Sequence, residues 1–156
     1  METFARAGWL TYAEQHGVWF HAPYAEFWAT AKELNGTIVG TIEKQDYIIS
    51  LDVIAKASGC EDEGLAYTSE WESNVGQTNV DIALYGSTRP KEHKEVSKWL
   101  RASNLKPFGR FLHNLLFNVF TPRTGSRDNV NNRDIFCLFH LMRKDRISLP
   151  RVILDH

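Results

Sequence analysis

Cysteine is scarce in this sequence of 156 residues: only Cys60 and Cys137 occur, and neither belongs to a CxxC motif or a Cys/His cluster. Two isolated cysteines argue against a disulfide framework and against a structural zinc site. A chain of this length buries enough surface to fold without such cross-links. A reducing compartment is therefore the expected environment.

Long hydrophobic runs are missing as well. No apolar stretch approaches the roughly 18 residues of a membrane span, and residues 1–10 are interrupted by Glu2 and Arg6, unlike the core of a signal peptide. We therefore expect a soluble, intracellular protein that makes no membrane contact.

Motifs for catalysis and cofactor binding are absent. The glycines match neither GxGxxG nor GxxxxGKS/T, and the six histidines form no HExxH. Cys137 lies between Phe136 and Leu138, which is typical of a small buried hydrophobic residue. Seven acidic side chains of the first half are candidates for general acid–base catalysis, but most of them fall in an expected loop that lacks a rigid support; they are Asp46, Asp52, Glu61, Asp62, Glu63, Glu70 and Glu72. We expect no enzymatic activity, no catalytic residue, no metal and no cofactor.

The first half of the chain predicts two helices and a hairpin. Aromatic spacing and Pro23 predict a helix over 23–34, which Asn35-Gly36 would end. Two β-branched runs within 37–49 predict a β-hairpin. Ser50 can then cap a short helix that ends at Gly59. Residues 60–88 are acidic and polar with scattered apolar positions, so we expect a long loop there, with one short element near Val80 to Leu84.

The second half predicts more helix. Amphipathic patterns cover 91–102, 133–144 and 149–155, the last capped by Ser148. The strongest pattern spans 108–120, whose apolar positions predict the central core helix: Phe108, Phe111, Leu112, Leu115, Leu116, Val119 and Phe120. The fold class is therefore mainly α (α+β), a single helical domain over 1–156 with one small β-hairpin near 37–49. Because the final pattern is cut short, we expect an N-terminal fragment of a longer polypeptide.

Charge is distributed unevenly although the net charge is only −1. Residues 1–78 hold 4 Lys/Arg and 12 Asp/Glu, a balance of −8, and residues 79–156 hold the other 14 and 7, a balance of +7. The two halves can neutralise each other within one domain. Alternatively, they can join copies head to tail or give the basic half a nucleic-acid face. The candidate phosphate contacts around the last two strong helices are Arg123, Arg127, Arg133, Arg143, Lys144 and Arg146. The alternative is that they cap helix ends and solvate the surface.

The C-terminal part resembles the putative plant transposon protein family, which is related to first-open-reading-frame (Gag-like) proteins of plant retrotransposons. The resemblance covers most of residues 24–156, including the EFWATA stretch from Glu26 to Ala31; further matching residues are Phe111, Leu112, Leu115, Pro122, Asn129, Val130, Arg133, Ile147, Leu149 and Ile153. It implies a non-enzymatic structural or interaction module that acts by protein–protein contact or self-association. The alternative function is nucleic-acid binding, with weak RNA or DNA contact, by the basic C-terminal half.

Overall fold

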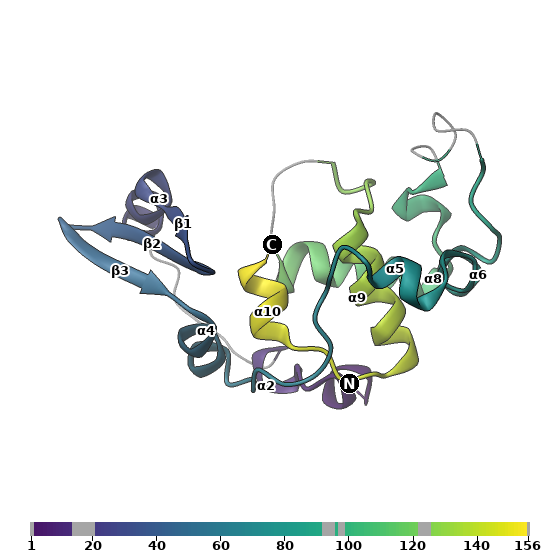
Figure 1. The fold of residues 1–156 in the computed structure, drawn as a ribbon, viewed down its shortest axis with the longest axis horizontal. Helices are drawn as coiled ribbons and strands as arrows, with labels where there is room; N and C mark the ends of the chain where they lie inside the picture. The colour runs from purple at the N-terminus through teal and green to yellow at the C-terminus, as the bar shows by residue number, and fades with distance from the viewer. Residues whose placement is uncertain (1, 14–20, 92–95, 97–98, 122–125, 156) are drawn as a thin grey trace.

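The computed structural model describes residues 2–13, 21–91, 96, 99–121 and 126–155. These residues form a mainly helical fold with one three-stranded antiparallel sheet, so the expected fold class is confirmed. The sheet and helix α3 lie at one end of the molecule and most of the helices gather at the other (Figure 1). Helices α4 and α10 pack together between these two parts.

The sheet is larger than the expected hairpin. Strand β2 (Thr37–Ile42) pairs with β3 (Gln45–Ile49) as expected, and it also pairs with a third strand, β1 (Lys32–Leu34). The helix predicted over 23–34 is instead α3 (His21–Thr30), and Asn35-Gly36 is the turn between β1 and β2. Both turn residues have positive φ, 51° and 73°, which suits a tight hairpin turn as well as a helix end. The expectation of a helix stop was therefore wrong.

Gly40 in β2 lets helix α3 lie directly on the sheet. A Cβ built at this position would lie 2.6 Å from a ring carbon of Phe27 in α3 and 2.8 Å from the Phe27 carbonyl oxygen. Phe27 is buried, and the Thr30 hydroxyl accepts a hydrogen bond from the backbone N–H of Thr41 at 2.7 Å. Close approach at a glycine thus fixes the small unit of α3 and the sheet.

Helix α4 (Leu51–Ser58) follows the sheet with the predicted ends. The Ser50 hydroxyl accepts from the backbone N–H of Val53, and Gly59 adopts the left-handed conformation, with φ of 66°. Both predicted caps are confirmed.

Residues 60–88 are more ordered than the expected loop. They contain α5 (Trp71–Val75) and α6 (Gln77–Tyr85), which bury Trp71, Val80 and Leu84 in the core. The composition is misleading because the charges of Glu72 and Asp81 are neutralised by Arg89. The long-loop prediction was wrong for α5, whereas α6 covers the short element expected near Val80 to Leu84 and extends it.

The N-terminal helices α1 (Glu2–Ala7) and α2 (Leu10–Ala13) join the core through aromatic side chains. Phe4 and Trp9 are buried and their rings lie 5.2 and 5.1 Å from that of Phe120. The Trp9 indole donates to the backbone carbonyl of Ile147 at 2.8 Å. This bond ties the start of the chain to its end.

The helix expected over 91–102 lies mainly outside the described residues. Its described end forms the short 3₁₀ helix η1 (Ala102–Asn104), and Trp99 packs on Tyr85 with ring centroids 4.1 Å apart.

The helix predicted over 108–120 is present as α8 (Pro107–Leu115) and a π-helical turn, η2 (Leu116–Phe120), but it does not bury the expected stripe. Phe108, Phe111 and Val119 are exposed. The buried side chains are Leu112, His113, Leu116, Phe117 and Phe120. The seven predicted positions span a wider arc of the helix than one packing face can cover. The side chains at the edge of this arc therefore remain exposed to solvent.

The central helix is α9 (Asn132–Arg143) rather than α8. All eight residues from 134 to 141 are buried, far more than the single face that an amphipathic helix buries. Asn131 and Asp134 form a reciprocal capping box at its start. Helix α10 (Leu149–Leu154) begins at Ser148, whose hydroxyl accepts from the backbone N–H of Arg151, as predicted.

Two leucines of α8 give a matched test of this packing. Leu112 is 1% exposed, whereas Leu115 is only partly buried against the core. We predict that Leu112→Ala lowers the free energy of unfolding by about 2–5 kcal/mol and that Leu115→Ala lowers it less. Urea unfolding of both variants measures the difference. A larger loss for Leu115→Ala would contradict the structure, because it would mean that α8 turns the side bearing Leu115, not the side bearing Leu112, towards the core.

Candidate functional site

The acidic segment after α4 is bound to the C-terminal part of the chain. Arg146 makes ion pairs with Glu61 at 2.8 Å and Glu63 at 3.1 Å. Arg151 pairs with Asp62 at 2.9 Å, and the Ser148 hydroxyl donates to the same carboxylate. The hydrogen bond from Ser148 holds the pKa of Asp62 below its ordinary value. These acids therefore hold two distant segments together, which favours local neutralisation as the meaning of the charge asymmetry.

A second cluster joins α5 and α6 to the loop that follows them. Arg89 pairs with both Asp81 and Glu72, and its side chain is only 14% exposed. The guanidinium also lies 5.8 Å from the centre of the Trp99 ring, a cation–π distance. Asp81 is 2% exposed and accepts from the backbone N–H of Arg89 as well. A buried acid that is fully engaged in this way has a structural role.

His140 is the best candidate for an acid–base group, yet both of its ring nitrogens are engaged. Its Nε2 accepts from the Trp71 indole at 2.8 Å, so the proton lies on Nδ1, which donates to Asp145 Oδ2 at 2.8 Å. Burial lowers the pKa of His140 below 6.5. The neutral ring is thus locked between two partners. The sequence did not predict this arrangement because Trp71 was placed in a loop.

The other nucleophile or base candidates are buried in α8 and α9. His113 is 3% exposed, its Nε2 lacks a hydrogen-bond partner, and Asp134 Oδ2 is 3.6 Å away. Cys137 is buried as predicted, and burial raises the pKa of its thiol. Within the described ranges, no three His, Cys, Asp or Glu side chains converge in a way that could hold a metal ion.

Three of the six predicted phosphate contacts, Arg143, Lys144 and Arg146, are paired with acidic side chains of the chain itself. Arg146 pairs with Glu61 and Glu63, and Lys144 pairs with Glu2 at 3.0 Å. Arg143 pairs with Asp145 at 3.1 Å and lies over the Phe139 ring. Arg133 is exposed at the start of α9, where it lines a hollow with Asp155. Arg123 lies outside the described residues. Arg127 lines a different hollow, along α8.

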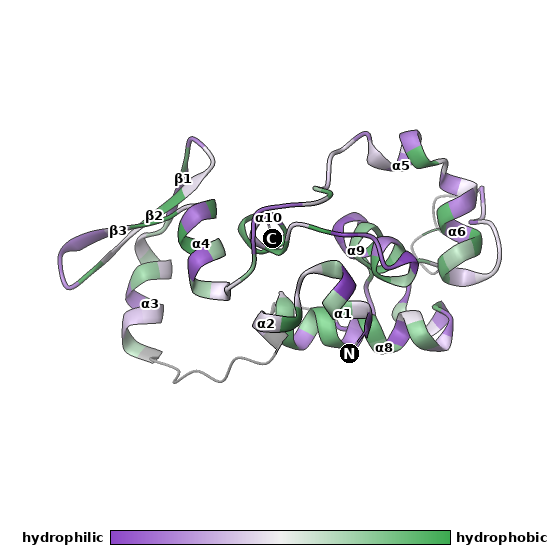
Figure 2. Ribbon diagram, turned by 90° about the horizontal axis from the view of Figure 1, so that it is seen from below, coloured by the Kyte–Doolittle hydropathy of each residue, from purple (hydrophilic) through white to green (hydrophobic). Residues whose placement is uncertain are grey.

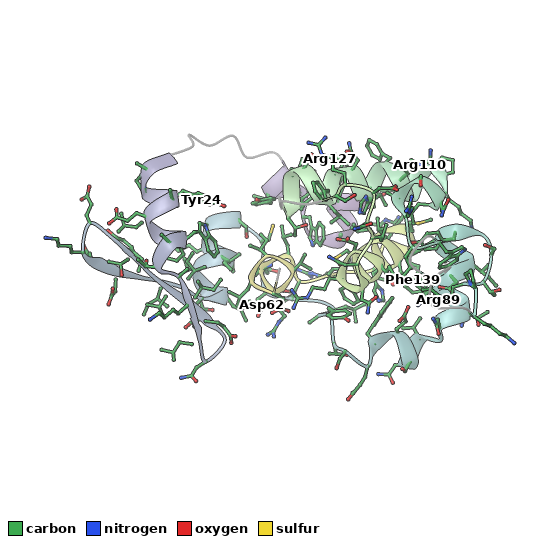
Figure 3. The ribbon with its side chains drawn as sticks, turned by 90° about the horizontal axis from the view of Figure 1, so that it is seen from above. Tyr24, Asp62, Arg89, Arg110, Arg127 and Phe139 are labelled. Carbon is green, nitrogen blue, oxygen red and sulfur yellow. The ribbon has the colours of Figure 1, made fainter. Side chains whose placement is uncertain are left out.

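Arg127 lies at a hollow along α8 that the sequence did not predict. Arg110 belongs to α8, and Arg127 lies beside this helix (Figure 3). The guanidinium of Arg127 is 5.9 Å from the centre of the buried Phe117 ring. The remaining lining residues are Ala102, Pro107, Phe111, His113 and Asn114. Arg110 was overlooked because α8 was expected to be a core helix, although Arg110 and Asn114 are exposed one helical turn apart.

An apolar groove lies between the sheet unit and the C-terminal helix. Trp28 from α3 and Val53 from α4 are each 47% exposed at this groove. Its other lining residues are Tyr12, Ile38, Ile49, Ile54, Ala57, Ser58, Ile153 and Leu154. Figure 2 shows hydrophobic residues on β2 and α4, two of the elements that line this groove. The sequence pattern placed Trp28 on one helical face with Tyr24 and Phe27, and of these three only Phe27 is buried.

The sheet unit also has two open edges. In the strand order β1-β2-β3, the outer strands β1 and β3 each pair on one side only within the described part of the chain. Leu34 in β1 and Tyr47 and Ile48 in β3 are exposed by 60%, 44% and 59%. Open edges with exposed apolar side chains are suited to pairing with another chain.

Comparison with protein-family models, curated proteins and solved structures gave no match. Among the described helices, none combines the length and hydrophobicity needed to span a membrane.

The locked state of His140 predicts how stability depends on pH. A buried neutral histidine is stabilising above its unfolded pKa of about 6.5, and this contribution is lost as the pH falls below that value. Replacing His140 by Gln keeps an acceptor and a donor but removes the titration.

We therefore predict that wild type loses stability relative to His140→Gln between about pH 7 and pH 5. Unfolding free energies of both proteins across this range provide the measurement. A relative gain of wild type at low pH would show instead that a charged His140 paired with Asp145 stabilises the fold.

Proposed function

We propose that this chain is a non-enzymatic structural or interaction module of a plant retroelement, Gag-like, which acts by protein–protein contact. The observation that carries the proposal is the apolar groove lined by Trp28 and Val53 beside the open sheet edges. Exposed apolar surface of this kind is typical of a surface that another protein covers. The resemblance of residues 24–156 to the plant transposon family supports the same assignment.

Three of the described acid–base groups are engaged by other protein groups. His140 uses both ring nitrogens, and Asp62 and Asp81 each hold an arginine. A general base needs a nitrogen or oxygen free to accept the substrate proton. These contacts therefore support a structural role over an enzymatic one.

A second copy of the chain is the partner that we infer. Identical copies present the same groove and the same sheet edges. A dimer with two-fold symmetry can therefore cover the groove and one edge of each copy at the same time. Strand β3 offers an unpaired backbone row next to the exposed side chains of Tyr47 and Ile48. Antiparallel pairing of two β3 strands would satisfy this row.

Two valines give a matched test. Val53 lines the groove and is 47% exposed, whereas Val119 in η2 is 43% exposed away from it. We predict that wild type self-associates as its concentration rises and that Val53→Gln weakens this association about tenfold, a change of about 1.4 kcal/mol. Glutamine adds no charge, so the substitution leaves the electrostatics of helix α4 unchanged.

Sedimentation velocity over a concentration series measures the association. Val119→Gln should behave as wild type. A wild-type chain that stays monomeric at every concentration contradicts the proposal, and so does an equal loss in both variants.

A further inference from the structure

The hollow along α8 combines two uncompensated guanidinium groups. Arg110 donates to the backbone carbonyls of Ser103 and Leu105, and these neutral acceptors leave its charge unbalanced. Arg127 lies over the Phe117 ring. Within the described residues, neither arginine has an ion pair with a carboxylate, in contrast to Arg89, Arg146 and Arg151.

The acidic residue next to Arg127 in the sequence does not neutralise either arginine. Asp128 follows Arg127 directly, but its carboxylate accepts from the backbone N–H of Ser103 at 3.1 Å and lies 3.8 Å from Arg101. Among the residues that the structure describes, no acidic side chain lines the hollow, whose polar members are Arg110, His113, Asn114 and Arg127. The electrostatic character of the hollow therefore favours an anion.

An aromatic ring is exposed beside these charges. Phe111 lines the hollow and is 56% exposed, the highest value among the exposed aromatic side chains. A free anion such as phosphate gains nothing from an exposed phenyl ring. A ligand that carries both a phosphate and a flat base uses the arginines and the ring together, because bases stack on aromatic side chains irrespective of their sequence.

We propose that this hollow binds single-stranded nucleic acid, with backbone phosphates on Arg110 and Arg127 and a base stacked on Phe111. Asn114, exposed one turn after Arg110, supplies an amide N–H donor for a base edge or a sugar hydroxyl, while its Oδ1 accepts from the Asn118 amide at 2.8 Å. Single strands are favoured over duplexes because only an unstacked base can reach the phenyl ring. This site is separate from the apolar groove and does not depend on self-association.

The test measures fluorescence anisotropy of labelled oligouridylate, oligothymidylate and a duplex DNA with the whole chain. We expect both single strands to bind and the duplex to bind more weakly. Each phosphate contact that is lost should reduce the slope of log affinity against log salt by about 0.7. Arg127→Gln should therefore lower both the affinity and this slope.

Two phenylalanines provide the matched control for stacking. Phe108 lies on the same helix and is 46% exposed but does not line the hollow. Phe111→Ala should weaken binding at least fivefold and leave the salt slope unchanged, since it removes no charge. Phe108→Ala and Arg143→Gln should bind as wild type. The circular dichroism melting curve of each variant checks that the fold is intact.

Oligouridylate and oligothymidylate distinguish RNA from DNA as the source of the strand, and binding of either supports the site. Three results would overturn it: no binding of either single strand, tighter binding of the duplex, or equal losses in Phe108→Ala and Phe111→Ala. None of these depends on Val53, so failure here leaves the self-association proposal untouched, and the reverse also holds.

Discussion

The burial of helix α9 on all sides is the constraint from which the rest of the fold follows. A helix with eight consecutive buried residues cannot stand at the surface, so other elements must cover each of its faces. Helices α1, α6 and α8 pack against it, and α5 contributes Trp71, whose ring lies 5.2 Å from Phe136. The polar groups that this burial traps are satisfied locally: Asp134 caps the helix, and His140 bonds Trp71 and Asp145.

The acidic segment 61–63 and the basic C-terminal segment meet beside the enclosed helix α9. Residues around Leu65 cross the C-terminal segment, where Leu65 and Ile147 form a parallel bridge with backbone hydrogen bonds in both directions. The ion pairs of Glu61, Asp62 and Glu63 flank this crossing. Exposed pairs of this kind contribute about 0–1 kcal/mol each. They align the two segments more than they stabilise them, while the apolar core supplies most of the free energy.

Local signals in the sequence predicted local structure well. Ser50, Gly59 and Ser148 marked helix ends because a cap depends on a few neighbouring residues. Asn35-Gly36 was misassigned because its positive φ fits both a helix end and a hairpin, and only the pairing of β1 decides between them. Helix α5 was missed, and α6 was predicted only as a short element, because their charges are neutralised by Arg89, which no local pattern reveals.

The candidate surfaces were harder to predict than the fold. Composition identified basic residues, yet Lys144 and Arg146 are paired with acids more than 80 positions away in the chain. Arg110 and Phe111 were hidden within a strong hydrophobic pattern that was taken for core. Which side of an apolar helix faces outward depends on the elements that cover it. That information is long-range, so the groove and the hollow emerged only from the tertiary structure.

The central claim is that α9 organises a closed core, while the sheet unit presents its edge and groove to a second copy. Hydrogen–deuterium exchange of the chain at low and high protein concentration tests this claim most directly. We predict that residues 135–141 exchange slowest at both concentrations, and that exchange in β3 and α4 slows as the concentration rises. Fast exchange in α9, or slowing confined to elements away from the sheet unit, would contradict the account.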